Sequence, residues 1–588
     1  MTTKIQDYFI GLALASLSVI VCVSKMYWGH DWGGDFSGYI AQAISITTHS
    51  AQHYIADNTQ IISQTDGIYG PYAYPWGFPI LLAFMYKLFG FNFYAFKSVG
   101  VICFGIFVLL FYVFCRKYIA RKYAFCATLL FALNPSLTMS ASNSVLSDIP
   151  FLCVGFGTLL ALGSLFGSHK IGSHTHSKMI QKVTEKANIV GGGAKYNLIS
   201  HSSDSFSNTS LSFWQNLIFY GAPFAISLLG GILMLLACLI RMNGMVIVLA
   251  LLCMHSVLML KCCAPNLCEA IAHKPYLCFL RPIFSIKTPF SLCSAFGFGV
   301  HILPYIVFGI GYGFVVSHLS SGGSGHFEIF ASMSLKSIVG NLRYYTIDCL
   351  YAEFFAIPKK VLNVPIFVLC VPLMWWGLVS VKKFYHAQNP QNPQKAILTY
   401  NQSQEVFFGI FILGFLGLLV LWVGLQGIRF VYLVLPFMVF WGARGVAIGR
   451  VGGINASSKI KTYTRFVCVL LMVIMGYFVI NNLVFTASHK AKQLESGGSF
   501  NPLALEVYEF IKAKTPQDAK ILFIKPRVLY LATHRLSFAS SNINRIKEAD
   551  YVLLCDDMPF SQEGDLRFQE QVKLVFENAK FRLYQVLR

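Results

Sequence analysis

Long apolar runs, nearly free of charged residues, recur along the chain and limit what it can fold into. Each run is about 18–22 residues long, close to the roughly 20 residues that a helix needs to cross a bilayer. We therefore expect about eleven transmembrane helices. They lie at residues 8–27, 92–114, 123–140, 149–166, 217–238, 243–260, 289–317, 363–381, 406–424, 430–448 and 466–486.

The composition supports this interpretation. Only 12% of the 588 residues are charged, against roughly 25% in soluble domains, while 55% are hydrophobic and the mean hydropathy is +0.59. So few charges cannot cover a water-soluble surface of this size, which argues against disorder, a fibrous repeat or an ordinary cytosolic enzyme. The sequence predicts a polytopic all-α membrane protein with a small C-terminal α/β soluble domain.

The net charge of +21 is distributed unevenly. With the amino terminus inside, the predicted inner segments carry 22 basic and 5 acidic residues, whereas the outer segments before residue 487 carry 9 and 8. This is the asymmetry of the positive-inside rule. Because topology accounts for the excess, we expect no nucleic-acid partner. The first apolar run lacks a clear cleavage site and is expected to stay as an anchor.

Two regions follow from this layout. Residues 1–486 form the membrane module, with long outer loops at 28–91 and 318–362, and residues 487–588 are soluble-like and lie outside. In the first loop, Gly77 to Phe89 is apolar but only half a span long, which predicts an interfacial or re-entrant helix. In the tail we expect a helix from Asn501-Pro502, strands at 521–524, 551–554 and 581–586, and a helix at 568–576.

The most informative motif is Gly33-Gly34-Asp35-Phe36-Ser37, just past the first span. It places a carboxylate at the outer membrane surface, where Asp35 could act as a general base on an acceptor hydroxyl or amine. The alternative is that Asp35 only caps a helix that begins near Ser37, and residue chemistry alone favours this alternative somewhat.

Three other charged residues stand at outer span ends. Arg429 and Arg241 are suited to binding a lipid-linked phosphate, because a guanidinium can hold phosphate in bidentate fashion. The alternative for each is an arginine that snorkels from a helix end. Asp148 is a second candidate carboxylate, and N-capping before Pro150 explains it about equally well.

Aromatic residues lie near these charges in the sequence. The segment Tyr69 to Pro79 is rich in aromatic residues and proline, and it could form a rim around a sugar or isoprenoid chain. An ordinary aromatic belt at the interface explains it better on residue chemistry alone. The candidate rim residues are Tyr39, Tyr72, Tyr74, Trp76 and Tyr432. No cysteine and histidine spacing fits a metal site, so we expect neither a metal nor a cofactor.

Together these motifs resemble bacterial glycosyltransferase family 39, membrane enzymes of the GT-C fold related to protein O-mannosyltransferases and to the aminoarabinose transferase of lipid A. The segments that carry the resemblance are short. They are the Gly34-Asp35 turn, Tyr74 to Leu82 leading to Gly90, Leu146 to Phe151, Arg429 to Phe437, and Thr515 to Ala519 before a tail strand. The chain departs from the family at position 34, which is Gly rather than a second acid, and at Trp76, where a second proline is common.

The resemblance implies a multi-pass enzyme of the bacterial inner membrane, with its C-terminal domain in the periplasm. It would transfer a sugar from a polyprenyl-phosphate donor to a lipid, glycan or protein acceptor, with inversion at the anomeric carbon. Asp35 and Asp148 would be the cavity carboxylates, and Arg429 and Arg241 would hold the phosphate. The alternatives are a secondary transporter and a polymerase or ligase of cell-envelope polysaccharide.

Overall fold

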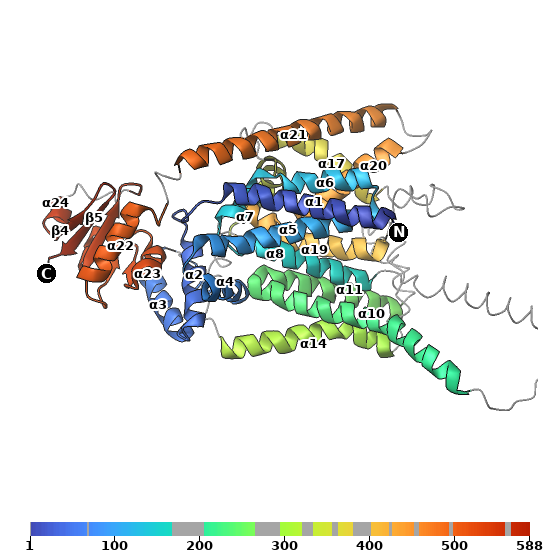
Figure 1. Cartoon of the computed structure of the whole chain (residues 1–588), viewed down its shortest axis with the longest axis horizontal. Coiled ribbons are helices and arrows are strands. Elements are labelled where there is room, and N and C mark those ends of the chain that lie inside the picture. The colour runs from blue at the N-terminus through green and yellow to red at the C-terminus, as the bar shows by residue number, and fades with distance from the viewer. Residues whose placement is uncertain are drawn as a thin grey trace, which may run out of the picture.

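The chain is an elongated helical bundle with a small sheet domain at one end. In Figure 1 the amino terminus lies at one end of the bundle and the carboxyl terminus lies in the sheet domain beyond the other end. The computed structural model describes residues 2–67, 70–166, 205–264, 295–319, 333–355, 363–379, 401–422, 426–451, 458–492, 498–558 and 566–587. Residues 320–332 and 356–362 of the second predicted outer loop lie outside the described residues.

Eight helices in the described part of the chain are long and apolar enough to cross a membrane. This confirms a multi-pass, mostly helical membrane protein. The elements that contain these spans are α1 (Thr2–Lys25), α5 (Phe93–Tyr118), α8 (Asp148–Leu165), α10 (Ser205–Ile240), η1 (Met242–Gly244) with α11 (Met245–Cys263), α14 (Ala295–His318), α19 (Gln402–Leu421) and α21 (Ser458–Lys492).

The predicted count of eleven spans is higher than the eight or nine that the described residues support. The span expected at 123–140 is a broken pair, α6 (Arg121–Ala132) and α7 (Pro135–Asn143), bent by 50°. Pro135 starts α7 and the Asn134 side chain caps it, so the break has a local cause. The spans expected at 363–381 and 430–448 correspond to two 17-residue helices, α17 (Asn363–Val379) and α20 (Leu435–Val451).

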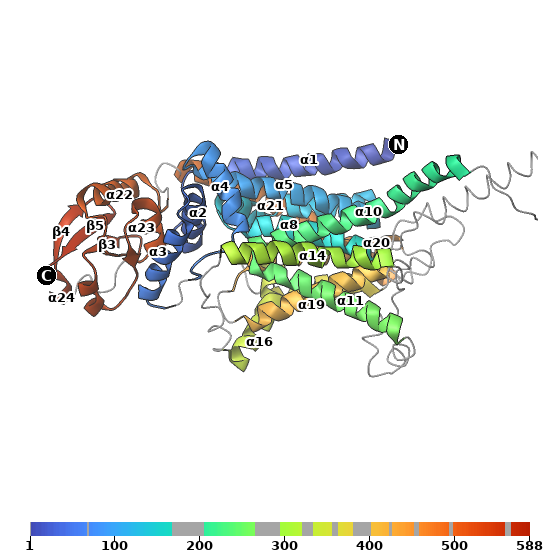
Figure 2. The ribbon, with the colours of Figure 1, turned by 90° about the horizontal axis from the view of Figure 1, so that it is seen from below.

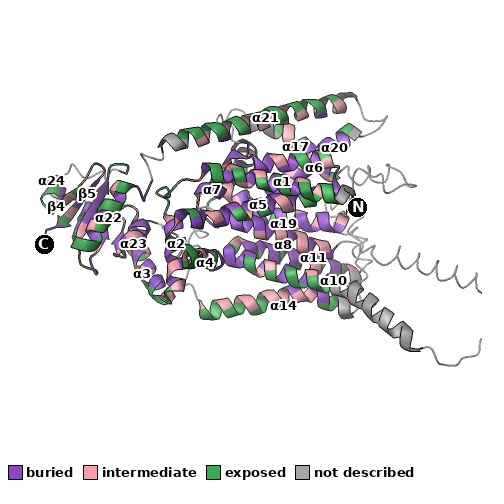
Figure 3. Cartoon of the chain, viewed as in Figure 1, coloured by how far each residue is buried: buried purple, intermediate pink, exposed green. Residues whose placement is uncertain are grey.

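The helices differ in how much of their surface the protein covers (Figure 3). The most apolar window of α8 is 72% buried and that of α5 is 61% buried, whereas the values for α14 and α21 are 17% and 22%. Helices α5 and α8 therefore form the centre of the bundle. Helices α14 and α21 present their apolar side chains to the surroundings, as lipid-facing helices do.

The first outer loop folds into three helices, α2 (Gly34–Thr47), α3 (Ala51–Gln64) and α4 (Gly77–Phe89). Helix α4 is the short apolar helix predicted at these residues, and it packs against α2, α5 and α10. The second outer loop contributes α16 (Leu335–Arg343) and the π-helix η4 (Tyr344–Glu353). A 3₁₀ turn, η7 (Ile428–Val431), leads into α20.

The C-terminal domain has a mixed five-stranded sheet of order β2-β1-β3-β5-β4. Strand β1 pairs in parallel with β2 and β3, while β5 pairs in antiparallel fashion with β3 and β4. The strands are β1 (Ile521–Leu522), β2 (Ser537–Phe538), β3 (Tyr551–Cys555), β4 (Val572–Glu577) and β5 (Phe581–Val586). The helical elements are α22 (Pro502–Lys514), α23 (Pro526–Thr533), η8 (Ile543–Glu548) and α24 (Leu566–Gln569).

One element of this domain was predicted wrongly. The helix expected at 568–576 is mostly strand β4, because Val572 to Phe576 pairs with β5. A short apolar run fits a strand or a buried helix equally well by periodicity, and the neighbouring strand decides between them. The helix expected from Asn501-Pro502 is α22, with Pro502 in its first turn and the Asn501 side chain accepting from the Ala504 N–H.

The C-terminal domain docks on the first outer loop. The Ser499 N–H donates to the His30 carbonyl oxygen at 2.9 Å, and the Asp66 N–H donates to the Ala539 carbonyl oxygen at 2.9 Å. The Tyr530 hydroxyl donates to Asp57 Oδ2 at 2.6 Å. Figure 2 shows α3 beside α23 from a second direction. The domain is therefore fixed against α2 and α3, the elements that carry the candidate acid Asp35.

Candidate functional site

Asp35 lies in the first turn of α2, and its carboxylate contacts distant residues. Its Oδ1 accepts a hydrogen bond from the Tyr74 hydroxyl at 2.8 Å, and its Oδ2 lies 3.5 Å from Arg429 Nη1. Helix α2 begins after Gly33 without a side-chain cap, and Asp31 Oδ1 accepts from the Gly33 N–H instead. The capping alternative for Asp35 is therefore not what the structure shows. The side chain is 42% exposed, which leaves room for a substrate group.

Tyr74 is held in place from two directions. Its main chain exchanges two hydrogen bonds with the Gln42 side-chain amide, at 2.9 and 3.0 Å. Its ring packs on Tyr39, with 4.0 Å between the ring centroids. Burial, helped by the negative charge of Asp35, raises the pKa of Tyr74 well above its usual value. The phenol therefore stays protonated and donates to the carboxylate.

Arg429 supplies the cation beside Asp35. It lies in η7, and its guanidinium carbon is 5.0 Å from the ring centroid of Phe430. Burial lowers the pKa of Arg429, but the negative charges of Asp148 and Asp35 outweigh burial, and the net result is a raised pKa. Arg429 therefore keeps its charge, and 31% of its side chain remains exposed.

Asp148 and Arg241 form a second ion pair near the first. Arg241 Nη1 donates to Asp148 Oδ1, with the two side chains 18% and 5% exposed. The guanidinium carbon of Arg241 lies 5.5 Å from the ring centroid of Phe430. Asp148 stands at the start of α8, and the residue before it, Ser147, makes no side-chain cap. The Asp148 carboxylate thus pairs with Arg241. Its position in the first turn of α8 also lets it interact favourably with the helix dipole.

The structure therefore brings all four predicted charged residues together: both arginines lie near the Phe430 ring, and each pairs with one of the two carboxylates. The two ion pairs differ in character: Asp148–Arg241 is largely buried, whereas Asp35–Arg429 is longer and more accessible. A loosely paired, accessible carboxylate can accept a proton, and an accessible guanidinium can bind an anion. Phe430, which lies near both arginines, was not among the predicted site residues, because an apolar side chain next to Arg429 looks like any other residue of an apolar run.

The aromatic residues predicted as a rim are mostly buried. Tyr39, Tyr74, Trp76 and Tyr432 are at most 7% exposed. Tyr39 shares a hydrogen bond with Ser147 at 2.9 Å, Tyr432 shares one with Ser140 at 2.7 Å, and Trp76 donates to the Leu319 carbonyl oxygen at 2.8 Å. The polar tips of these four side chains find partners inside the fold, and their role as a rim stays a prediction. Tyr72 is half-buried, and its carbonyl oxygen accepts from Asn58.

Within the described ranges, no group of three or more His, Cys, Asp or Glu side chains is placed to hold a metal ion.

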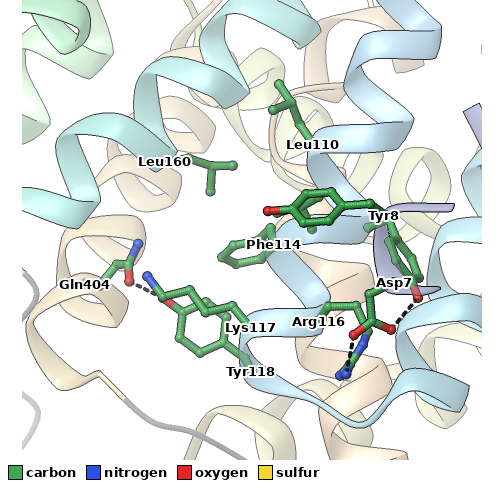
Figure 4. Close-up of a pocket in the computed structure, with 11 residues that line it drawn as sticks. Asp7, Tyr8, Leu110, Phe114, Arg116, Lys117, Tyr118, Leu160 and Gln404 are labelled. Carbon is green, nitrogen blue, oxygen red and sulfur yellow. Dashed lines mark hydrogen bonds and ion pairs between the residues drawn. The ribbon is translucent and has the colours of Figure 1, made fainter. Parts of the chain in front are cut away.

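A cavity of about 480 Å³ lies near the opposite end of the bundle, between the start of α1 and the end of α5 (Figure 4). Asp7 lies at its edge and pairs with Arg116 at 2.8 Å and with Arg121 at 2.7 Å. None of the predicted site residues lines this cavity. No motif in the sequence predicted this cavity.

No family model matches the sequence, and no curated protein matches it. Among solved structures, the chain is similar to ArnT from Cupriavidus metallidurans bound to undecaprenyl phosphate, with 9% identity, a TM-score of 0.47 and 97% of each chain covered. It is also similar to the oligosaccharyltransferase AglB from Archaeoglobus fulgidus in complex with an inhibitory peptide and a dolichol-phosphate. There the identity is 10% and the TM-score 0.46, covering 94% of this chain and 69% of that one.

Proposed function

We propose that this protein is a membrane glycosyltransferase that moves a sugar from a polyprenyl-phosphate donor to a lipid, glycan or protein acceptor at the outer face of the bacterial inner membrane. The observation that carries the proposal is the meeting of Asp35 and Arg429 at 3.5 Å. These residues are 394 positions apart in the chain, and both side chains remain accessible. The resemblance of the sequence motifs to a glycosyltransferase family indicates the class of reaction in which such a pair would act.

The two residues would act on opposite ends of the transfer. Asp35 accepts the proton of the acceptor hydroxyl or amine while that atom bonds to the anomeric carbon of the sugar. The bond between the anomeric carbon and the phosphate oxygen breaks, and its electron pair leaves with the polyprenyl phosphate. Arg429 stabilises the negative charge that develops on that phosphate, supported by Arg241. Attack from the side opposite the leaving group inverts the anomeric configuration.

Asp148 has a supporting role in this proposal. Its carboxylate is 5% exposed and bonded to Arg241, so it is poorly placed to take a proton from a substrate. Its charge fixes the Arg241 guanidinium and adds to the negative field that keeps Arg429 protonated. We therefore assign proton transfer to Asp35 and the positioning of Arg241 to Asp148.

The first test is binding. The purified full-length protein in detergent is titrated with undecaprenyl phosphate, undecaprenyl diphosphate and undecaprenol. We expect the monophosphate to bind at least tenfold more tightly than the alcohol, since a charge-assisted hydrogen bond contributes about 1.5–3 kcal/mol. Arg429→Gln should lose about 10- to 100-fold of that affinity for the same reason. Arg545→Gln, which removes another outer arginine paired with an aspartate, Asp66, should bind like the wild type.

The second test is turnover. Proteoliposomes are supplied with undecaprenyl-phosphate-linked hexoses and pentoses plus extracted envelope lipids, and released undecaprenyl phosphate is measured. Asp35→Asn should retain binding but lose about 10²- to 10⁴-fold of the rate, the usual effect of losing a general base. Full turnover in Asp35→Asn, or equal binding of the alcohol and the phosphate, would remove the proposal. A preference for the diphosphate would favour a polysaccharide polymerase or ligase.

A further inference from the structure

The C-terminal domain contributes a buried arginine to the network around Asp35. Arg527 lies in the first turn of α23, directly after Pro526, and is 3% exposed. Its guanidinium points out of its own domain. Nε donates to Asn58 Oδ1 at 3.0 Å, Nη2 to the Pro71 carbonyl oxygen at 2.6 Å, and Nη1 to the Tyr74 hydroxyl at 2.8 Å.

The outer loop is shaped to receive this side chain. Gly70 has a φ of +100°, and a Cβ at this position would lie 3.2 Å from Arg527 Nη1. Only glycine adopts this backbone conformation readily while leaving space for the guanidinium. The Asn58 amide, which accepts from Arg527, also donates to the Tyr72 carbonyl oxygen and so holds the same loop.

The donor and acceptor groups of Arg527, Tyr74 and Asp35 fix the direction of the two hydrogen bonds that connect them. An arginine only donates and a carboxylate only accepts, so the Tyr74 hydroxyl accepts from Arg527 and gives its one proton to Asp35. A cation on the accepting side of a hydroxyl polarises it and strengthens the bond that it donates. Arg527 can therefore influence Asp35 without touching it.

We propose that Arg527 is a positioning residue for Asp35, acting through Tyr74, so that the candidate site is complete only when the C-terminal domain is docked. This inference rests on the proposed function. Tyr74 and Arg527 hold Oδ1 of Asp35, and Oδ2 stays 3.5 Å from Arg429. Without the hydrogen bond from Tyr74, the Asp35 carboxylate rotates to pair more closely with the Arg429 guanidinium. It then competes with the phosphate of the donor for Arg429.

The experiment measures undecaprenyl phosphate binding in the full-length protein. Arg527→Gln and Tyr74→Phe should each weaken binding by about five- to tenfold, the effect expected for one ordinary hydrogen bond, because the change reaches the phosphate only through the contact between Asp35 and Arg429. The double variant should bind no more weakly than Tyr74→Phe alone, because the two residues act in series. In an Asp35→Asn background neither change should matter, since no carboxylate remains to compete.

Two control variants separate this role from domain stability. Arg535→Gln removes the other arginine that is buried in the described part of the domain, and its contacts with Thr533, Lys512 and Thr515 stay inside the domain. Tyr530→Phe removes a docking bond to Asp57 that does not involve Tyr74. Both should bind undecaprenyl phosphate like the wild type, even where they lower the melting temperature. If Arg527→Gln does not fold, Tyr74→Phe with and without Asp35→Asn decides the question alone.

Two kinds of result would contradict the role of Arg527. Wild-type affinity in Tyr74→Phe, or a double variant whose loss is the product of the single losses, would overturn the inference and leave the proposed function intact. Equal binding of undecaprenyl phosphate and undecaprenol by the wild type would instead remove the proposed function and this inference with it.

Discussion

At the scale of single residues, the partner of a charge decides its role. Asp31 and Asp35 are four residues apart in one glycine-rich turn, yet Asp31 accepts from a main-chain N–H two residues away and Asp35 faces Tyr74 and Arg429. The same contrast separates the arginines. Arg241 is tied to a buried carboxylate, whereas Arg429 has a longer and more accessible contact. These contacts are why we propose Asp35 and Arg429 as the reactive pair.

The Asp148–Arg241 pair gives a prediction on stability. Arg241→Gln leaves the Asp148 carboxylate, which is 5% exposed, without its guanidinium partner. We expect a loss of about 3 kcal/mol in stability, as is usual when one member of a buried ion pair is removed. The Asp148→Asn/Arg241→Gln double variant should recover most of it, because no uncompensated charge remains. Thermal unfolding in detergent measures both.

Binding separates structure from function at this pair. If Arg241 supports the donor phosphate, the double variant should fold like the wild type and still bind undecaprenyl phosphate more weakly. If the double variant is as unstable as Arg241→Gln alone, the loss of stability does not come from an uncompensated charge on Asp148.

At the scale of elements, hydrophobic periodicity predicts the helices and strands that form from local sequence. It does not predict the elements whose conformation depends on packing with a neighbouring element. The long apolar runs became helices because a helix satisfies its own backbone in lipid. Most of the helix expected at 568–576 is strand β4, because pairing with β5 stabilises the strand conformation there. Helix α2 entered only through the capping alternative for Asp35, as a helix that begins near Ser37, and α3 was expected only as part of a loop. Both depend on packing with other elements, α2 with α4 and α23, and α3 with α23. Asp35 and Arg429 could each be singled out from the sequence. Their meeting at one site was expected only from the family resemblance, since nothing local links α2 to η7.

Helices α17 and α20 illustrate an element contact that composition does not reveal. A Cβ on Gly445 would lie 2.1 Å from the Leu373 carbonyl oxygen, and one on Gly377 would lie 1.9 Å from the Trp441 carbonyl oxygen. The two backbones therefore touch, as small residues allow in membrane helix pairs. The Arg444 Nε donates to the Gly377 carbonyl oxygen at 2.7 Å across this contact.

Alanine substitutions test this packing. Gly445→Ala forces the helices apart and should cost about 1–3 kcal/mol, the range for overpacking. Gly442→Ala is the matched control on the same helix, because its Cβ would meet only the Met374 side chain at 3.8 Å. It should be neutral or slightly stabilising, since alanine favours helix over glycine by about 0.5–1 kcal/mol. Equal melting temperatures for the two variants would contradict the close contact.

At the scale of the whole molecule, the two ends of the bundle have different chemistry. The amino terminus and the Asp7–Arg116–Arg121 cluster lie at one end, and α2, α3 and the C-terminal domain lie at the other (Figure 1). The candidate site therefore belongs to the end that carries the sheet domain. The predicted inner segments carry 22 basic residues against 9 in the predicted outer segments before residue 487, so the positive-inside rule predicts that this end faces outward.

Cysteine labelling tests this orientation. We choose exposed positions at the two ends: Gln52 in α3 and Lys514 in α22 on one side, Lys122 in α6 and Arg450 in α20 on the other. In intact cells of a bacterial host whose outer membrane has been permeabilised, a membrane-impermeant maleimide should label Gln52→Cys and Lys514→Cys above the signal of the unsubstituted chain. Lys122→Cys and Arg450→Cys should react only once the inner membrane is opened. The reverse pattern would place Asp35 and Arg429 on the cytoplasmic face, where the charge asymmetry does not allow them.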